Sequence, residues 1–257
     1  MSTIGAVGDW YIGRIPGVDT KLVHNPVLEL AKVKTERELR FMEESAKVVE
    51  TVFDEVKEEL SEGMTELELR NIIDMLLLEK GAERRAYPTI VAFGKNTASP
   101  HPVSSIERLS SGDWVMVDFG AMVKGFSVGL CRTFVFGSPS QEQEELFAIV
   151  KEGYERMLVF LKPGVLLEKA DGEMREFFAS EGMVEYALEL GGMGVGMTKD
   201  GIYVGPGYPG VFVEGMALQL TPALFVPGKG GVKFSDVVVG VPEGTRLLTR
   251  VPLEISL

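Results

Sequence analysis

Apolar side chains recur every three to four residues in two segments of the first half of the chain, a spacing typical of amphipathic helices. The first segment follows Thr35, a helix-capping residue, and stops before Gly63. The second segment begins at a similar cap, Thr65, and stops at Gly81. The sequence therefore predicts two helices, which lead into strand-like sequence at residues 87–94.

The same order of elements returns in the second half. Ser140 caps a third predicted helix, and a fourth runs from about Glu168 into glycine-rich, strand-like sequence. Three markers reappear at an offset of 101 residues: Leu60, Gly63 and Gly81 match Leu161, Gly164 and Gly182. We interpret this repeat as two αα-β halves of one α+β domain. Its strands form a curved, mainly antiparallel sheet, its helices lie outside, and a cleft lies between the halves.

One hairpin-like segment between the two pairs of predicted helices carries an unusual charge. Residues 115–137, VMVDFGAMVKGFSVGLCRTFVFG, contain two runs rich in Val and Phe around a glycine-containing turn. This pattern is typical of a β-hairpin. Asp118 is the single carboxylate of the first run, and burying a carboxylate is costly unless something pairs with it. We therefore expect a specific partner for Asp118.

Composition narrows the class of protein. The chain has 257 residues and a net charge of −12, which argues against a nucleic-acid partner. Its single cysteine, Cys131, excludes an internal disulfide framework and favours the cytoplasm. No apolar run approaches the ~20 residues of a membrane helix, and no signal peptide is evident, so no membrane partner is expected. We expect a soluble protein with an N-terminal arm at 1–33, holding one or two short strands, and a domain at 34–257.

Four motifs occur in order along the chain: IVAFGKNTASPHP, GDWVMVDFGAMVKGFSVGLCRTFVFG, GGMGVGMTKDG and GMALQLTPALFVPGKGGVKFSD. Together, over roughly residues 34–250, they resemble the pita-bread metallopeptidases: methionine aminopeptidase, aminopeptidase P, proline dipeptidase and creatinase. The branch of proline dipeptidase and aminopeptidase P is the most similar. The resemblance implies the pita-bread fold, and peptide hydrolysis by two metal ions bound to Asp, Glu and His ligands.

The resemblance also places five metal-ligand positions in this chain. The first is Asp118, in the DFG-like strand, and the second, an Asp before an RT pair in the family, is Gly129 here. The remaining three are the His of a GHGxG turn, the Glu of an xEP triplet and the Glu of an RxED-like ending. This chain has Met193, Thr221 and Ser235 there. Because a hard divalent ion needs charged oxygen or imidazole ligands, we expect no dinuclear centre.

Other positions of the resemblance supply candidates for peptide binding. His101 matches the substrate-facing histidine of a PH motif, and Lys233 replaces a family arginine and can pair with Asp118. Asp200 takes the place of a second substrate-binding histidine, and Glu189 stands where a further histidine often occurs. We expect these five side chains around an altered cleft, with His101, Asp118 and Lys233 lining one concavity.

Two further residues offer alternative chemistry. Asp236 would have to replace Ser235 as a ligand, but neighbours on a strand point to opposite faces. Cys131 would act as a nucleophile only beside a base, and His101 is the candidate base. A buried structural cysteine fits the apolar strand better.

Two functional hypotheses follow. The favoured one is a proline dipeptidase-like protein with a degenerate metal site, catalytically inactive and without a cofactor, that binds a peptide or a protein. The alternative is an active, metal-dependent Xaa-Pro dipeptidase or aminopeptidase that holds Mn, Co or Zn with non-standard ligands. Both hypotheses are compatible with a homodimer.

Overall fold

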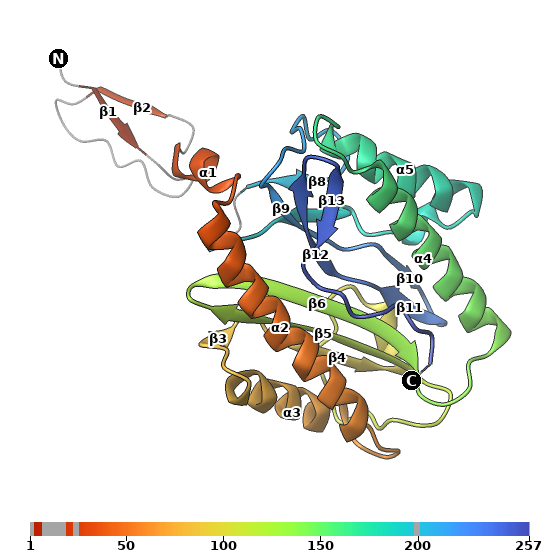
Figure 1. The fold of residues 1–257 in the computed structure, drawn as a ribbon. Coiled ribbons are helices and arrows are strands. Elements are labelled where there is room, and N and C mark those ends of the chain that lie inside the picture. The colour runs from red at the N-terminus through yellow and green to blue at the C-terminus, as the bar shows by residue number, and fades with distance from the viewer. Residues whose placement is uncertain (1–2, 7–18, 23–25, 198–200, 257) are drawn as a thin grey trace.

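A computed structural model describes residues 3–6, 19–22, 26–197 and 201–256 of the chain (Figure 1). In its first half, helix α2 (Glu36–Glu59) follows Thr35, and helix α3 (Glu66–Glu79) follows Thr65. Both predicted capping boxes are present, each cap accepting a backbone hydrogen bond from the third helical residue. The other elements of this half are β3 (Arg84–Arg85), β4 (Ile90–Phe93), the 3₁₀ helix η1 (Gly94–Ala98), β5 (Trp114–Val123) and β6 (Phe126–Val135).

Strands β5 and β6 form the predicted hairpin. Its two-residue turn consists of Lys124 and Gly125, with φ of 51° and 80°, the left-handed geometry of a type I′ turn. This turn fits the twist of the strands and fixes their register. Asp118 therefore lies opposite Cys131, and Gly129 lies opposite Gly120.

The second half repeats the arrangement of the first. Helix α4 (Gln141–Phe160) follows the Ser140 capping box, whereas helix α5 (Leu167–Ser180) begins after Leu166 without a side-chain cap. An antiparallel sheet follows in the order β13-β12-β9-β7-β8, with β10 and β11 as a separate hairpin. The elements are η2 (Val184–Tyr186), β7 (Gly192–Gly194), β8 (Tyr203–Val204), β9 (Ala217–Leu220), β10 (Ala223–Val226), β11 (Gly230–Lys233), β12 (Asp236–Val241) and β13 (Gly244–Leu247).

The sequence markers of the repeat occupy equivalent structural positions. The two leucines are the C-cap residues of α2 and α4, and all four glycines that follow the helices have positive φ. A positive φ is accessible to glycine without steric cost. Gly81 and Gly182 directly follow the C-caps of α3 and α5 and end those helices, whereas Gly63 and Gly164 lie in the turns beyond the C-caps of α2 and α4. The predicted duplication is thus confirmed at these residues: Leu60 and Leu161, Gly63 and Gly164, Gly81 and Gly182.

The first half has a sheet of its own, in which β5 pairs with β3, β4 and β6. This sheet and the sheet of the second half, together the two half-sheets, meet where β6 passes the start of β12. Cys131 and Ser235 exchange backbone hydrogen bonds of 3.1 and 3.0 Å there. Helix α2 lies across β5 and β6, while α4 packs on the hairpin of β10 and β11 (Figure 1). One large hydrophobic cluster lies mainly in the first half and the other mainly in the second, and each also contains residues of the other half, such as Val237 in the first cluster and Trp114 in the second.

The N-terminal segment contains two strands that pair with each other. Strands β1 (Thr3–Ala6) and β2 (Asp19–Leu22) are parallel, and helix α1 (Pro26–Ala31), which sequence analysis did not predict, follows them. The chain then joins the second half-sheet, because the Lys34 N–H donates to the Gly215 carbonyl at 2.8 Å. Within the described ranges, no helix is long and apolar enough to cross a membrane.

Candidate functional site

Asp118 is buried at the joint between the half-sheets, and its partner is Lys233. The Lys233 Nζ atom lies 2.6 Å from Asp118 Oδ2, and the two residues are 6% and 4% exposed. The Tyr87 hydroxyl donates to the other carboxylate oxygen, Oδ1, at 2.8 Å. Both oxygens of Asp118 are thus paired, and the predicted pairing with Lys233 is confirmed.

This pair sets the protonation of its neighbours. Burial disfavours charge on Lys233, but the Asp118 carboxylate outweighs burial and raises the lysine pKa. Burial first, and then the charge of Asp118, raise the pKa of Tyr87 and the pKa of Cys131 well above their ordinary values. At neutral pH the site therefore contains an ammonium ion, a neutral phenol and a neutral thiol.

Gly129, at the second aligned ligand position, faces two side chains. A Cβ atom at this position would lie 2.4 Å from the Tyr87 hydroxyl oxygen and 2.6 Å from Gln219 Nε2, closer than real Cβ atoms approach. Gln219 Nε2 donates to Ser235 Oγ at 2.8 Å, which holds the amide in this position. An aspartate at position 129 would therefore have no room.

The other aligned positions border the same amide. Met193 lies opposite Gln219 in the pairing of β7 with β9, and Thr221 follows Gln219 by two residues, on the same face of an extended chain. The Thr221 hydroxyl donates to the Leu190 carbonyl at 3.5 Å. Together with Ser235, the five aligned positions gather around Tyr87 and Gln219.

These residues do not fit a pair of divalent ions. Such ions require several carboxylate or imidazole ligands, whereas this site offers one carboxylate, a thioether and two hydroxyl groups. The carboxylate, Asp118, is already paired with the ammonium of Lys233, whose charge repels cations. In the part of the chain that the structure describes, no group of three or more His, Cys, Asp or Glu residues could hold a metal ion.

Asp236 points away from this site, as the alternation of a strand predicts. Its Oδ1 accepts hydrogen bonds from Arg132 Nη2 and Thr249 Oγ1, both at 2.7 Å. Its Oδ2 accepts a bond of 3.0 Å from the Tyr154 hydroxyl of α4. Asp236 therefore belongs to a separate buried cluster and does not replace Ser235 as a ligand.

Cys131 is fully buried, in agreement with its interpretation as a structural residue. Its thiol donates to the Lys233 carbonyl at 3.5 Å, and its raised pKa disfavours the reactive thiolate. His101, the candidate base, is exposed. The structure therefore gives no support to a cysteine nucleophile.

His101 lies in a recess of about 730 Å³ that does not include the buried pair. Asp118 and Lys233 lie beneath the surface because each neutralises the other, so the expectation that all three line one concavity is wrong for this recess. The recess is lined by residues of the β4–β5 loop and of the β10–β11 turn: Lys95, Asn96, Ala98, Ser99, His101, Pro102, Val103, Ser105, Glu107 and Pro227.

Buried Glu66 fixes the loop that carries His101. Its Oε1 accepts hydrogen bonds from the Phe93 N–H at 2.7 Å and from Asn96 Nδ2 at 2.9 Å. Its Oε2 accepts two bonds of 2.7 Å from the N–H and the hydroxyl of Ser105. One carboxylate thus holds both ends of the loop, and His101 projects between two fixed points.

Glu189 does not line the His101 recess. Glu189 is exposed, and its backbone carbonyl accepts a hydrogen bond of 2.6 Å from Arg175 Nη2. Arg175 also pairs with buried Asp171, so it fixes the chain before β7. Asp200 lies outside the described residues.

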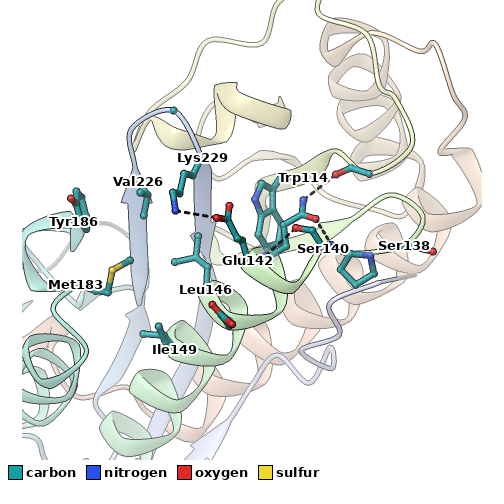
Figure 2. Close-up of a pocket in the computed structure, with 15 residues that line it drawn as sticks. Trp114, Ser138, Ser140, Glu142, Leu146, Ile149, Met183, Tyr186, Val226 and Lys229 are labelled. Atoms are coloured by element: carbon teal, nitrogen blue, oxygen red, sulfur yellow. Dashed lines mark hydrogen bonds and ion pairs between the residues drawn. The ribbon is translucent and has the colours of Figure 1, made fainter.

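Figure 2 shows a second recess, of about 770 Å³, beside the start of α4. Lys229 Nζ and Glu142 Oε1 lie 3.5 Å apart at its rim. Pro227 lines the His101 recess while its neighbours Val226 and Gly228 line this one, so both recesses share the β10–β11 turn. The larger apolar residues that line the second recess are Trp114, Leu146, Ile149, Met183, Tyr186 and Val226.

Comparison with known proteins identifies the family of this fold. The sequence pattern of metallopeptidase family M24 matches residues 40–240. The chain belongs to this family. The Xaa-Pro dipeptidase of Pyrococcus horikoshii is 30% identical over 236 residues, which are 91% of this chain and 67% of that protein.

Solved structures agree with this assignment. The prolidase from Pyrococcus furiosus has a TM-score of 0.88 and 30% identity, over 91% of this chain and 69% of that one. The X-Pro aminopeptidase from Thermotoga maritima also has a TM-score of 0.88, with 29% identity over 93% and 69%. The predicted pita-bread fold is therefore confirmed. This M24 chain spans about two-thirds of the length of these relatives.

Sequence reasoning missed the two side chains at the centre of the site, Tyr87 and Gln219. A signal for Gln219 was present, because it precedes Thr221 by two residues and a strand places such residues on one face. No comparable signal marked Tyr87, whose contact with Asp118 depends on how the chain returns from α3 to β4.

Proposed function

We propose that this M24 chain is a proline dipeptidase-like protein that does not hydrolyse peptides with metal ions and instead binds a peptide or a protein. The observation that carries the proposal is the buried ion pair: Lys233 Nζ lies 2.6 Å from Asp118, the one carboxylate among the aligned ligand positions. Metal-dependent hydrolysis needs a bound water with a lowered pKa, and that needs a metal held by charged ligands. In this chain the ammonium group of Lys233, and no metal-binding set of charged ligands, lies beside Asp118.

The competing function is active, metal-dependent Xaa-Pro dipeptide hydrolysis, with Mn, Co or Zn. The relatives named Xaa-Pro dipeptidase and prolidase favour it. The side chains of this chain weigh against it, because a fold retained in a family does not preserve the chemistry of a site whose ligands have changed.

Hydrolysis and metal content together test the proposal. The chain, purified without chelator, is soaked in Mn²⁺, Co²⁺ or Zn²⁺ and assayed with Xaa-Pro dipeptides and longer Xaa-Pro peptides, beside the prolidase from Pyrococcus furiosus as a positive control. We expect no turnover and no stoichiometric metal. Turnover that depends on metal and is lost in Asp118→Ala would refute the proposal and establish the dipeptidase.

The peptide-binding part of the proposal assigns binding to the His101 recess. Its imidazole is exposed on a loop that Glu66 holds in place, and the neighbouring Lys95 supplies a positive charge for a peptide carboxylate. Titration of a proline-containing peptide into wild type, His101→Ala and Tyr186→Ala tests the site, since Tyr186 lines the other recess. We expect weaker binding in His101→Ala alone. Weaker binding in Tyr186→Ala alone would move the site to the recess of Figure 2.

The proposal also covers the cellular location of the protein and the boundaries of its domains. We assign the protein to the cytoplasm, supported by a single thiol that is buried and free. We assign residues 34–257 to the peptidase-like domain and residues 1–33 to an arm, supported by the pairing of β1 with β2 and by the entry of Lys34 into the second half-sheet.

A further inference from the structure

The polar contacts of the candidate site cross from one half of the domain to the other. Asp118 and Tyr87 belong to the first half, and Lys233, Gln219 and Ser235 belong to the second. The ion pair of Asp118 with Lys233 is one crossing contact. The approach of the Gln219 amide to the Tyr87 hydroxyl is another, because both groups lie against Gly129, at 2.6 and 2.4 Å from a Cβ built there.

Glycine at position 129 leaves the space in which these contacts form. A Cβ atom built on Gly129 would point at the Tyr87 hydroxyl. The Gln219 amide approaches the same position, with its nitrogen 2.6 Å and its oxygen 2.9 Å from that Cβ. A residue with any side chain here would have to displace both groups. Gly129 and Gln219 therefore form a matched pair, one leaving the space that the other fills.

The joint is electrically balanced without a metal ion. Asp118 supplies one negative charge and Lys233 one positive charge, while the tyrosine hydroxyl, the amide and the Ser235 hydroxyl are neutral. A cluster of unpaired carboxylates in the same place would repel one another unless cations bound to them. Each polar group of this cluster instead has a hydrogen-bonding partner within the protein, which is the condition for burying it without a large cost.

We propose that Tyr87 and Gln219 occupy the space aligned with the family's metal site and convert it into a metal-independent joint between the two half-sheets. The loss of ligands alone would leave an open polar cavity. The two side chains close that cavity, and they explain why position 129 holds glycine. The inference rests on the proposed absence of metal chemistry. It concerns the side chains that fill the space aligned with the metal site.

A double-mutant cycle tests the contact between the two side chains. Tyr87→Phe, Gln219→Ala and the double variant are compared with wild type by thermal unfolding. We expect each single variant to lower Tm by roughly 2–6 °C, as loss of a buried hydrogen bond does in a domain of this size. The double variant should lose clearly less than the sum, because both changes remove the same contact. Additive losses would overturn the proposal.

Gly129→Ala tests the filling of the space directly. In wild type it should lower Tm by roughly 4–10 °C through overpacking. In the Tyr87→Phe/Gln219→Ala background the same change should cost less than half as much, because both clashing groups are gone. Folding of Gly129→Ala only in that background would support the proposal even more strongly.

Gly120→Ala is the matched control on the facing strand. Its Cβ would lie 2.8 Å from the Val128 carbonyl oxygen, 2.9 Å from Ala86 Cβ and 3.0 Å from Tyr87 Cε1. The Tyr87→Phe/Gln219→Ala background removes none of these atoms, because phenylalanine keeps the ring carbon. We therefore expect the same loss of Tm for Gly120→Ala in both backgrounds. An equal cost of Gly129→Ala in both backgrounds would overturn the inference. Because only thermal stability is measured, failure here is distinguishable from the finding of hydrolysis that would refute the proposed function.

Discussion

Two buried clusters lie beside the joint between the half-sheets, and they contain the same kinds of groups. Each combines a carboxylate, a cation and a tyrosine hydroxyl. Only one of them stands where the family resemblance places a metal ligand. The two clusters are Asp118 with Lys233 and Tyr87, and Asp236 with Arg132 and Tyr154.

The clusters differ in how they attach to the backbone. The Arg132 guanidinium donates to Asp236 and also to the backbone carbonyls of Cys131, Ser235 and Val251, at 2.7, 3.1 and 2.6 Å. Its planar fork can hold several acceptors at once. The Asp236 cluster therefore ties β6 to β12 and to the C-terminal segment through main-chain contacts.

The Asp118 cluster connects side chains above all. The Lys233 ammonium is a point charge that binds the carboxylate. The Phe119 carbonyl oxygen lies 2.9 Å from the Tyr87 hydroxyl and shares its single proton with Asp118. The comparison shows that the Asp118 cluster, at the aligned metal-ligand position, is built like the structural ion pair of Asp236. It makes fewer hydrogen bonds to the backbone. We expect it to contribute less to stability than the Asp236 cluster.

The largest effect is expected for Arg132→Met. The change leaves Asp236 buried without a cation and removes three contacts to carbonyls, so it should cost about 3–5 kcal/mol of the free energy of unfolding. Urea unfolding measures it. Arg246→Met, which breaks a half-exposed pair with Glu43, is the control and should cost about 0–1 kcal/mol. Equal losses in the two variants would contradict the structural role of Arg132.

Lys233→Met should have the next largest effect. It leaves Asp118 without its cation but keeps the Tyr87 hydrogen bond, so the loss should be about 3 kcal/mol, at the lower end for a broken buried pair. Replacing both partners, in Asp118→Ala/Lys233→Met, should cost less than Lys233→Met, since no unpaired charge remains. If the double variant were the less stable one, the pairing would not explain the loss.

Alkaline pH should weaken both clusters together. Burial raises the pKa of Tyr87 and Tyr154 above 10.0, and Asp118 raises that of Lys233 above 10.5. A raised pKa in the folded state gives stability that is full below the unfolded value and is lost as pH rises through the folded value. We therefore expect Tm to fall above about pH 10. Tyr87→Phe/Tyr154→Phe should flatten this fall, and an unchanged slope would assign it to other groups.

The smallest effect is expected for metal ions. Because neither cluster offers a free set of ligands, EDTA or added Mn²⁺ should shift Tm by less than about 1 °C, since a ligand that does not bind adds nothing by mass action. Differential scanning fluorimetry measures this, with the prolidase from Pyrococcus furiosus as the metal-binding control. A rise of several degrees with Mn²⁺ would show that the Asp118 cluster still binds cations.

Local patterns in the sequence determined the helices and the central hairpin. Thr35, Thr65 and Ser140 marked helix starts because a cap bonds to a residue three positions away. The turn at Lys124 and Gly125 likewise depends on neighbouring residues alone. Helix α1 escaped prediction because its 6 residues are too few to show a period.

Family motifs located the candidate ligands, but only the tertiary structure decided what surrounds them. Asp118 and Lys233 could be paired from motif positions, since both motifs lead to one site. The contacts of Tyr87 and Gln219 with Gly129 depend on how two half-sheets pack together, and periodicity along a chain carries no information on which side chains meet across such a joint. Likewise, the burial of the ion pair separated Asp118 from His101, because a neutralised pair can leave the surface while an exposed imidazole stays on its loop.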